Sequence, residues 1–191
     1  VTIGSRSKYR ALEVRDKIVE QWPEHDLSIS SGTNRDAASA ELVILATPWD
    51  AAATTALGVC DLLSGKVVVT MANALARIGK EFVPLIPPRG SVAASVQATV
   101  EDAYVAAAFQ HVPAKELGDL SARIDSDVLI CSDHPEATKA TTELVELIPG
   151  MRALDAGQLS NATAIEAFTA VLLQLNVRYR TRVALKLSGL D

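Results

Sequence analysis

Short apolar runs and longer amphipathic segments alternate along this chain. The runs at 42–46 and 67–71 are almost continuously apolar, which is typical of strands that are buried on both faces of a parallel sheet. Leu12, Val14, Ile18 and Val19 put an apolar stripe on a charged helix that ends near Trp22-Pro23, and a second helix is predicted at 135–148, with Pro135 in its first turn. Because strand, helix and strand follow one another at short intervals, we predict right-handed βαβ units and an α/β fold with a mostly parallel sheet.

Turn and capping residues place the other elements. A helix is expected to begin at Asp50 or just beyond it and to run to about Leu63, and Asp36 is expected to cap a one-turn helix. The proline-rich stretch Pro84–Gly90 is predicted to be a loop that crosses the sheet. Further strands are expected at 1–3, 27–30, 104–109, 127–131 and 151–154, and a further helix, capped by Ser91, at 91–100.

The last helix is expected to begin after a cap at Ser160 and Asn161. Its apolar residues recur every three or four positions, so the helix should pack across the body of the protein or onto a second subunit. These residues are Ile165, Phe168, Leu172 and Leu175.

The opening segment combines a β-branched strand with the turn Gly4-Ser5-Arg6 and the start of a basic helix. In dinucleotide-binding folds, an acidic residue after the second strand accepts hydrogen bonds from the ribose of NAD, whereas a cation there accommodates the 2′-phosphate of NADP. Here the acid is missing, and Arg6, Lys8 and Arg10 stand in its place. Ser5 and the guanidinium groups suit a phosphate, because cations are unfavourable in a first helical turn unless an anion neutralises them. The alternative is a solvated helix start.

A first strand and a Gly-rich phosphate loop should precede this segment, and neither is in the sequence. In the strand order 3-2-1-4-5-6 the first strand is central, so its loss would leave two unpaired sheet edges. We therefore expect a Rossmann-like doubly wound sheet whose first βα unit has been lost from the recorded chain, which starts without Met. The alternative is an edge strand of another fold. Residues 1–103 are expected to form a partial NADP-binding domain, and 104–191 a small C-terminal α/β part that ends in the long helix.

Three other predicted strand ends carry candidate ligand contacts, because ligands bind at the carboxyl ends of parallel strands. A ribose and nicotinamide could be lined by Thr47, Pro48 and Trp49. The alternative is that Trp49 is a packing anchor. Ala72 and Asn73 end the next strand; Asn73 could bond a carboxamide or simply form a turn. His111 could touch a cofactor or serve as a packing residue. The pair Asp133 and His134 is better explained by helix capping than by acid–base chemistry.

Composition limits the possible functions. The 191 residues carry a formal net charge of −5, which argues against a nucleic-acid surface, and they contain no apolar run of roughly 18 residues that would cross a membrane. Cys60 and Cys131 lie in apolar stretches, which favours buried free thiols in the cytoplasm. No HxxxH, CxxC or Gly-x-Ser-x-Gly pattern occurs, which argues against metal, redox-thiol or hydrolase chemistry. Hydride transfer requires none of these patterns.

Several of these segments together are similar to the NADPH-dependent reductases of the 5-deazaflavin coenzyme F420. They lie in family order over nearly the whole chain, and the run Leu-Asp-Ala-Gly-Gln-Leu-Ser-Asn at 154–161 is the most specific of them. The resemblance implies an oxidoreductase that moves a hydride between NADP(H) and coenzyme F420 as a cytoplasmic homodimer. The segments that carry it are 3–6, 33–38, 47–49, 112–114 and 154–161.

The resemblance also implies residue roles. Ser5, Arg6 and Arg10 would hold the 2′-phosphate, and the Thr47-Pro48-Trp49 turn would line the nicotinamide end. The turn Val112-Pro113-Ala114 would separate the nicotinamide from the deazaflavin. Thr169, on the last helix, would contact the deazaflavin.

Other features stay open at this point. Relatives carry a histidine where this chain has Gln110, with His111 beside it, so either residue could face the ligand. Arg178, Arg182 and Lys186 could attract the acidic tail of the coenzyme, although a solvated helix face explains them better. The rival functions are an NADPH-dependent reductase of another acceptor, such as a flavin, ferric chelate or imine, and a non-catalytic NADP-binding sensor or scaffold.

Overall fold

A five-stranded sheet of order β3-β4-β7-β8-β9 forms the body of the protein in the computed structural model, which describes residues 1–190. β3 (Leu42–Leu45), β4 (Val67–Thr70) and β7 (Tyr104–Ala107) are parallel. β8 (Ser126–Ser132) runs antiparallel to β7, and β9 (Met151–Asp155) runs parallel to β8. The α/β fold with a mostly parallel sheet is therefore confirmed.

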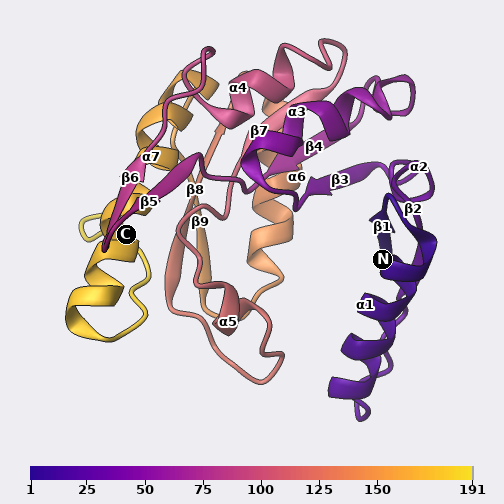
Figure 1. Ribbon diagram of the computed structural model, residues 1–191, viewed down its shortest axis with the longest axis horizontal. Coiled ribbons are helices and arrows are strands. Elements are labelled where there is room, and N and C mark those ends of the chain that lie inside the picture. Colours follow the sequence, from indigo (N-terminus) through magenta and orange to yellow (C-terminus); the bar gives the residue numbers. More distant parts are fainter. Residues whose placement is uncertain (191) are drawn as a thin grey trace.

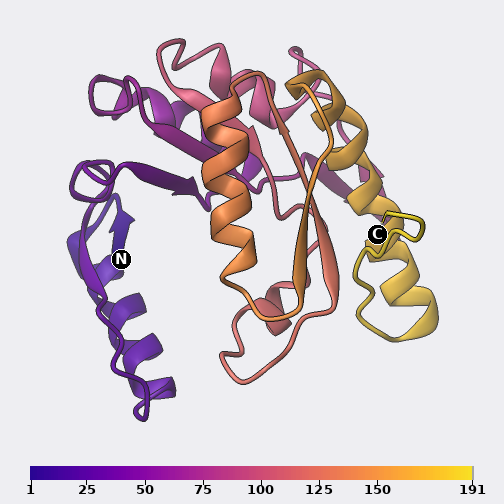
Figure 2. The same ribbon diagram turned by 180° about the vertical axis from the view of Figure 1, so that it is seen from behind.

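Helices cover both faces of this sheet (Figures 1 and 2). α3 (Trp49–Leu57) and α4 (Val92–Gln97) pack on one face, and α6 (Pro135–Glu146) packs on the other. Because side chains alternate along a strand, Val68 joins the α3 and α4 side of the core while its neighbour Val69 joins the α6 side. Both valines are fully buried, which explains why these strands read as continuous apolar runs.

An N-terminal unit stands beside β3 (Figure 1). It contains β1 (Thr2–Ser5), α1 (Lys8–Gln21), β2 (Ser30–Thr33) and α2 (Asn34–Ala37), and β1 and β2 pair in parallel as a separate two-stranded sheet. In the order 3-2-1-4-5-6 these strands take places 2 and 3, and β3 takes place 4. Within residues 1–190, no strand pairs with both β1 and β3, so the central place of this order is not filled by the described part of the chain.

Two contacts tie the N-terminal unit to the body. The Arg35 guanidinium donates to both carboxylate oxygens of Asp61 at 2.9 and 2.7 Å, and Lys66 Nζ donates to the Ala38 carbonyl at 2.7 Å. Asp61 lies in a short 3₁₀ turn at Cys60–Leu62 that follows α3. The predicted helix from Asp50 to Leu63 is therefore wrong at both ends: it begins at Trp49, ends at Leu57 and continues as this turn.

Two predictions in the N-terminal unit are wrong. The strand expected at 27–30 lies at Ser30–Thr33, where it pairs with Thr2–Ser5. The cap of α2 is Thr33 and not Asp36: the Asp36 amide donates to the Thr33 hydroxyl at 3.3 Å, and the Asp36 carboxylate accepts from the Thr33 amide at 2.7 Å. This reciprocal capping box satisfies two of the amide groups at the helix start.

A hairpin that the sequence reading missed lies between β4 and β7 in the chain and forms a separate two-stranded sheet. β5 (Leu75–Ile78) and β6 (Glu81–Pro84) pair antiparallel, and β6 packs along α7 (Ala162–Tyr179), where the Phe82 amide lies 3.4 Å from Gln174 Oε1. The loop predicted from Pro84 therefore begins with the last residue of a strand. The expected Ser91 cap of α4 is confirmed, since its hydroxyl accepts from the Ala94 amide at 2.9 Å.

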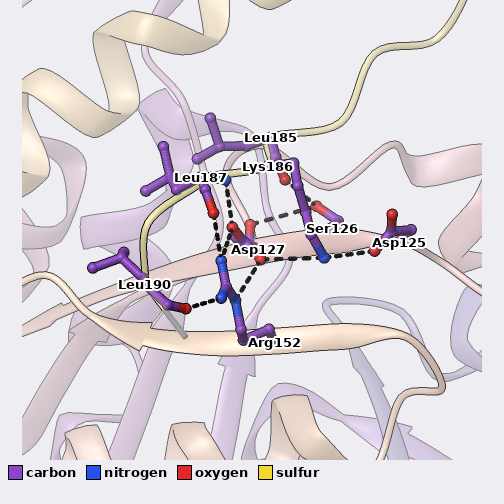
Figure 3. A network of polar contacts seen from close by, with 8 residues as sticks. All are labelled: Asp125, Ser126, Asp127, Arg152, Leu185, Lys186, Leu187 and Leu190. Carbon is purple, nitrogen blue, oxygen red and sulfur yellow. Dashed lines mark hydrogen bonds and ion pairs between the residues drawn. The ribbon is translucent and has the colours of Figure 1, made fainter.

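The chain ends in a C-terminal strap, residues 181–190, that returns to the start of β8 (Figure 3). The Asp127 amide donates to the Leu185 carbonyl at 2.8 Å, and the Leu187 amide donates to the Asp127 carboxylate at 2.6 Å. α7 ends before the strap, at Tyr179, and Arg180 follows in a left-handed conformation. No helix among residues 1–190 is long and apolar enough to cross a membrane. The domain boundary at 103/104 stays a prediction; β4 and β7, on either side of it, are sheet neighbours.

Candidate functional site

Polar groups from the segments that follow β4 and β7 meet a side chain of α7 just beyond the carboxyl ends of the two strands. The Thr169 hydroxyl lies 3.0 Å from Asn73 Oδ1 and 3.3 Å from the Gln110 carbonyl, and Asn73 Nδ2 donates to the same carbonyl at 3.4 Å. Residues 73, 110 and 169 are far apart in the sequence, so the fold brings them together. The predicted candidates Asn73 and Thr169 belong to this polar junction, and the Gln110 backbone is its common acceptor.

The chain turns sharply before Gln110 because Phe109 adopts a positive φ of 69°. A left-handed conformation is unfavourable for a residue with a large side chain, so local packing must maintain it. The Gln110 side chain is buried at 5% exposure, and its Nε2 donates to the Thr70 carbonyl at 3.1 Å. Its Oε1 is buried and has no hydrogen-bond partner among the described residues. Of the two residues left open by the sequence, Gln110 therefore carries a spare acceptor at the end of β7.

His111 is buried against α7. Its Nε2 lies 2.8 Å from the Ile165 carbonyl, and its ring meets Phe168 edge-on at a centroid distance of 5.6 Å. Burial lowers the pKa of His111, so the ring is neutral at neutral pH. Because the carbonyl only accepts, Nε2 carries the proton and Nδ1 is left as an acceptor. His111 thus attaches α7 to the end of β7.

The turn Thr47-Pro48-Trp49 lies at the carboxyl end of β3 and begins α3, with Pro48 as its N-cap residue. Thr47 Oγ1 is buried and finds no partner within residues 1–190. The Trp49 side chain is 37% exposed, so packing alone does not use its whole surface. Buried polar atoms without partners are rare. Residues 1–190 contain four of them, and two, Thr47 Oγ1 and Gln110 Oε1, lie just beyond the carboxyl ends of β3 and β7; the others are Glu116 Oε2 and Thr141 Oγ1.

Ser5, Arg6 and Arg10 lie together at the carboxyl end of β1 and the start of α1. Ser5 Oγ accepts from the Ser7 amide at 3.3 Å, and the first turn of α1 contains no acidic residue. Both arginines are exposed, and the described chain supplies neither with an ion-pair partner. This basic cluster fits an anion. It belongs to the N-terminal unit, and none of the hydrogen bonds found in residues 1–190 joins it to the polar junction (Figure 1).

The turn Val112-Pro113-Ala114 leads directly into α5 (Ala114–Leu117), with Pro113 as N-cap residue. Val112 packs in the core on the α6 side of the sheet, whereas Ala114 is exposed. Glu116 in α5 pairs with Arg182 of the C-terminal strap. This ion pair links α5 to the C-terminal strap.

Three sequence interpretations need correction. Arg178, Arg182 and Lys186 do not share a helix face, because α7 ends at Tyr179; Arg182 pairs with Glu116, and Lys186 with Asp125 and Asp127. Cys60 is free but exposed, whereas Cys131 is free and buried. On α7, Ile165 and Leu172 are buried, Leu175 is half-buried and Phe168 is 41% exposed, so the four do not form one packing face.

Asp133 and His134 make no acid–base pair. The Asp133 carboxylate accepts from the Leu159 amide at 3.0 Å, so it caps the 3₁₀ turn at Leu159–Asn161 and not α6. His134 is the N-cap residue of α6 without a side-chain cap bond, and its Nε2 lies 3.2 Å from Gln97 Oε1. Sequence reasoning also missed Glu166, a carboxylate buried inside α7 at 4% exposure, for which helical spacing gave no signal because it sits beside the apolar stripe.

Comparison with known proteins assigns the family. The chain is 36% identical over 187 residues to the F420-dependent NADP reductase of Methanocaldococcus jannaschii, which covers 95% of this chain and 84% of that protein. The chain belongs to the F420-dependent NADP reductase family. The reductase of Methanothermobacter marburgensis is 37% identical over 191 residues, with 96% of this chain and 84% of that protein covered.

The family profile described as "NADP oxidoreductase coenzyme F420-dependent" matches residues 1–74 of this F420-dependent NADP reductase family member. The crystal structure of a protein from Arthrobacter sp. FB24 superimposes with a TM-score of 0.82 at 24% identity and covers 98% of this chain and 88% of that chain. At this identity the likeness shows the fold, and it confirms the Rossmann-like architecture for the whole chain.

Proposed function

We propose that this protein transfers a hydride between NADP(H) and the deazaflavin coenzyme F420. The observation that carries this conclusion is the 36–37% identity to two curated F420-dependent NADP reductases over at least 95% of the chain. The geometry supports it, because buried acceptors without partners lie at the ends of β3 and β7, and a basic cluster without carboxylate partners lies at the end of β1.

We assign the 2′-phosphate of NADP to Ser5, Arg6 and Arg10. An NAD site would need an acidic residue after this strand, and the sequence has Arg6 there. A phosphate at this place would neutralise the cations in the first turn of α1 and would accept bidentate hydrogen bonds from a guanidinium group. Residues 1–103 then form the NADP-binding part of the protein.

We assign the nicotinamide end to Thr47, Pro48 and Trp49, with Ala72 and Asn73 beside them at the end of β4. Thr47 Oγ1 offers the hydrogen-bonding capacity, since it is buried and bonds to nothing in the described chain. Trp49 and Pro48 offer apolar surface, and Ala72 is buried at 7% exposure. These residues bind and orient one face of a ring and keep water from it.

We assign the deazaflavin end to residues of the C-terminal part, 104–191. NADPH, when bound, would supply a hydride to the deazaflavin ring, and the net reduction would also take up one proton from solvent. The work of the chain is to hold the two rings in contact and in the right order. The hydrogen bond from His111 to the Ile165 carbonyl and the polar junction at Thr169 keep α7 in position against the end of β7. The assigned contacts are Val112, Pro113, Ala114 and Thr169.

We also propose that two copies pair through α7 and the adjacent hairpin. Large apolar side chains on these elements are exposed: Ile78 at 65%, Phe168 at 41%, Val171 at 48% and Val177 at 51%. A second copy would cover them, and light scattering after size exclusion should give twice the chain mass, whereas Val171→Asp should give a monomer. The two unpaired cysteines are consistent with work in the cytoplasm.

Absorbance of the deazaflavin during steady-state turnover with NADPH tests the proposed function. Arg6→Ala should raise the KM for NADPH about 10- to 100-fold, because a hydrogen bond between charged groups is worth about 1.5–3 kcal/mol, and should leave turnover with NADH unchanged. Lys17→Ala, on the exposed side of the same helix, removes the same charge and serves as the control. Turnover of a flavin, ferric chelate or imine but not of coenzyme F420 would favour another acceptor, and NADPH binding without any turnover would favour a sensor.

A further inference from the structure

A carboxylate from α7 is buried at the start of α4. Glu166 is 4% exposed, and its two oxygens accept from the backbone amides of Val92 at 2.8 Å and Ala93 at 3.1 Å. Together with the Ser91 hydroxyl, which accepts from the Ala94 amide, this carboxylate satisfies the first turn of α4. Glu166 and Val92 are 74 positions apart in the sequence. Their contact therefore fixes α7 and α4 relative to each other.

The segment of α7 that Glu166 holds is the one that reaches the proposed site. The residue before it, Ile165, receives the hydrogen bond of His111 through its carbonyl. One helical turn after it, Thr169 bonds to Asn73 and to the Gln110 carbonyl. Because a helix moves as a rigid rod over one turn, any shift of Glu166 from α4 also shifts these two contacts.

We propose that Glu166 is a positioning residue of the hydride-transfer site: by holding the N-terminus of α4, its carboxyl group sets where α7 places the Ile165 carbonyl and the Thr169 hydroxyl. This inference rests on the proposed function for its kinetic consequence. Its structural consequence, that His111 responds to the state of Glu166, does not depend on the identity of the substrates.

The position of Glu166 makes this contact sensitive to pH. Burial raises the pKa of its carboxyl group to about 7, and the two backbone hydrogen bonds oppose that rise only in part. α4 carries no charged residue, and Ser91 is neutral. On β8, the Cys131 thiol has a pKa raised to about 11, first by burial and then by the charges of Asp155 and Glu166, so it stays neutral near pH 7. No cation among these groups holds the ionised carboxylate in place.

The sign of the effect follows from the raised pKa. The protonated carboxyl group is favoured where α7 is docked, and the ionised group is favoured where it reaches water. Raising the pH through about 7 therefore weakens the docking of α7 on α4. The ring contact of His111 and the affinity for the deazaflavin should weaken with it, whereas binding of the NADP phosphate at the distant basic cluster should not change.

Two measurements on the whole protein test this inference. In the first, the KM for coenzyme F420 is determined at pH 6 and pH 8 for the wild type, for Glu166→Gln and for Glu143→Gln, an exposed glutamate on α6. The ratio of KM at pH 8 to KM at pH 6 should be about three- to tenfold larger in the wild type and in Glu143→Gln than in Glu166→Gln, with kcat changed less than KM. In the second, ¹⁵N-labelled histidine spectra follow the three histidine rings, with His25→Gln and His134→Gln used for assignment.

The His111 ring signals of the wild type should shift with a midpoint near pH 7, and this shift should be absent in Glu166→Gln. The spectra are recorded without NADPH and without coenzyme F420. The wild-type titration is therefore informative even if Glu166→Gln does not fold. The positioning role is overturned if the His111 signals of the wild type do not move between pH 6 and 8, or if Glu166→Gln keeps the wild-type KM ratio. A wild type without F420 turnover whose His111 signals still follow Glu166 would reject the proposed function and support the coupling.

Discussion

Replacing Asp127 with alanine should destabilise the protein far more than replacing its neighbour Asp125. Asp127 has no exposed side-chain surface. The Arg152 guanidinium donates two hydrogen bonds to its carboxylate, at 3.0 and 2.9 Å. The same carboxylate accepts from the Leu187 amide at 2.6 Å (Figure 3). Asp125 is 78% exposed and bonds only to Lys186 among the partners found within residues 1–190.

The size of the effect follows from these contacts. Removing one partner of a buried ion pair typically costs about 3–5 kcal/mol, because the remaining charge stays behind without compensation. The Arg152 side chain is 33% exposed and also bonds to the Leu187 carbonyl at 2.7 Å, which relieves part of that cost. The Leu187 amide, in contrast, loses an acceptor. We therefore expect Asp127→Ala to lose about 3–4 kcal/mol of unfolding free energy, and Asp125→Ala less than about 1 kcal/mol, as for exposed pairs.

Urea unfolding followed by circular dichroism measures both losses. With an m-value of about 2–3 kcal/mol per molar, the midpoint of Asp127→Ala should fall by about 1–2 M and that of Asp125→Ala should hardly move. Arg152 also lowers the pKa of Asp127 below its ordinary value, so this stabilisation is present above about pH 4 and is lost as the pH falls further. The reasoning is refuted if the two variants unfold at the same urea concentration near pH 7.

Gly32, Thr169 and Glu166 each take part in a contact whose loss can be measured. Gly32→Ala should cost about 1–3 kcal/mol in urea unfolding, because a Cβ there would lie 2.6 Å from Asp36 Oδ2 and would disrupt the capping box; an unchanged midpoint would contradict this. Thr169→Val keeps the side-chain shape but leaves Asn73 Oδ1 without this donor, while the Gln110 carbonyl keeps only the 3.4 Å bond from Asn73 Nδ2. The variant should lose about 1–2 kcal/mol of unfolding free energy in thermal melts, and a melting curve equal to that of the wild type would refute the polar junction. Because the pKa of Glu166 is raised from 4.5 to about 7, its contribution favours folding at low pH and is lost as the pH rises to about 7; unfolding free energy should fall by about 2–3 kcal/mol more between pH 5 and 8 in the wild type than in Glu166→Gln, and equal pH profiles would exclude the effect.

The sequence predicted most of the sheet because the strands carry their signal locally. Val67–Thr70 is almost wholly buried, and Leu42–Leu45 is partly buried with Ile44 at 43% exposure, yet each is a run of apolar or β-branched residues that does not depend on its partners. The cap at Ser91 is local as well, since its acceptor and donor lie three residues apart. The same local logic failed at Asp36, because both Thr33 and Asp36 are good capping residues and the sequence does not say which of them stands outside the helix.

The hairpin β5–β6 was missed although a signal was present. Ile78 pairs with Glu81, so Gly79 and Lys80 form a two-residue turn, and Gly79 adopts the positive φ of 63° that such turns favour. Its strands are only four residues long and lie on α7 and not on the main sheet, so they lack the alternating pattern of a half-buried strand. Packing against a distant helix decided the structure here.

At the site, the strand-end rule identified Asn73 from the sequence, but the acceptor on which the polar junction is built could not be found that way. The Gln110 carbonyl reaches Asn73 and Thr169 because the chain turns at Phe109. A phenylalanine gives no sequence signal for a left-handed φ. A non-glycine residue held in that region costs on the order of 1–2 kcal/mol. Gln110 Oε1 adds the cost of a buried acceptor without a partner within the described chain, on the order of 1–3 kcal/mol. The packing around the end of β7 has to offset both costs, and no local sequence pattern encodes that packing.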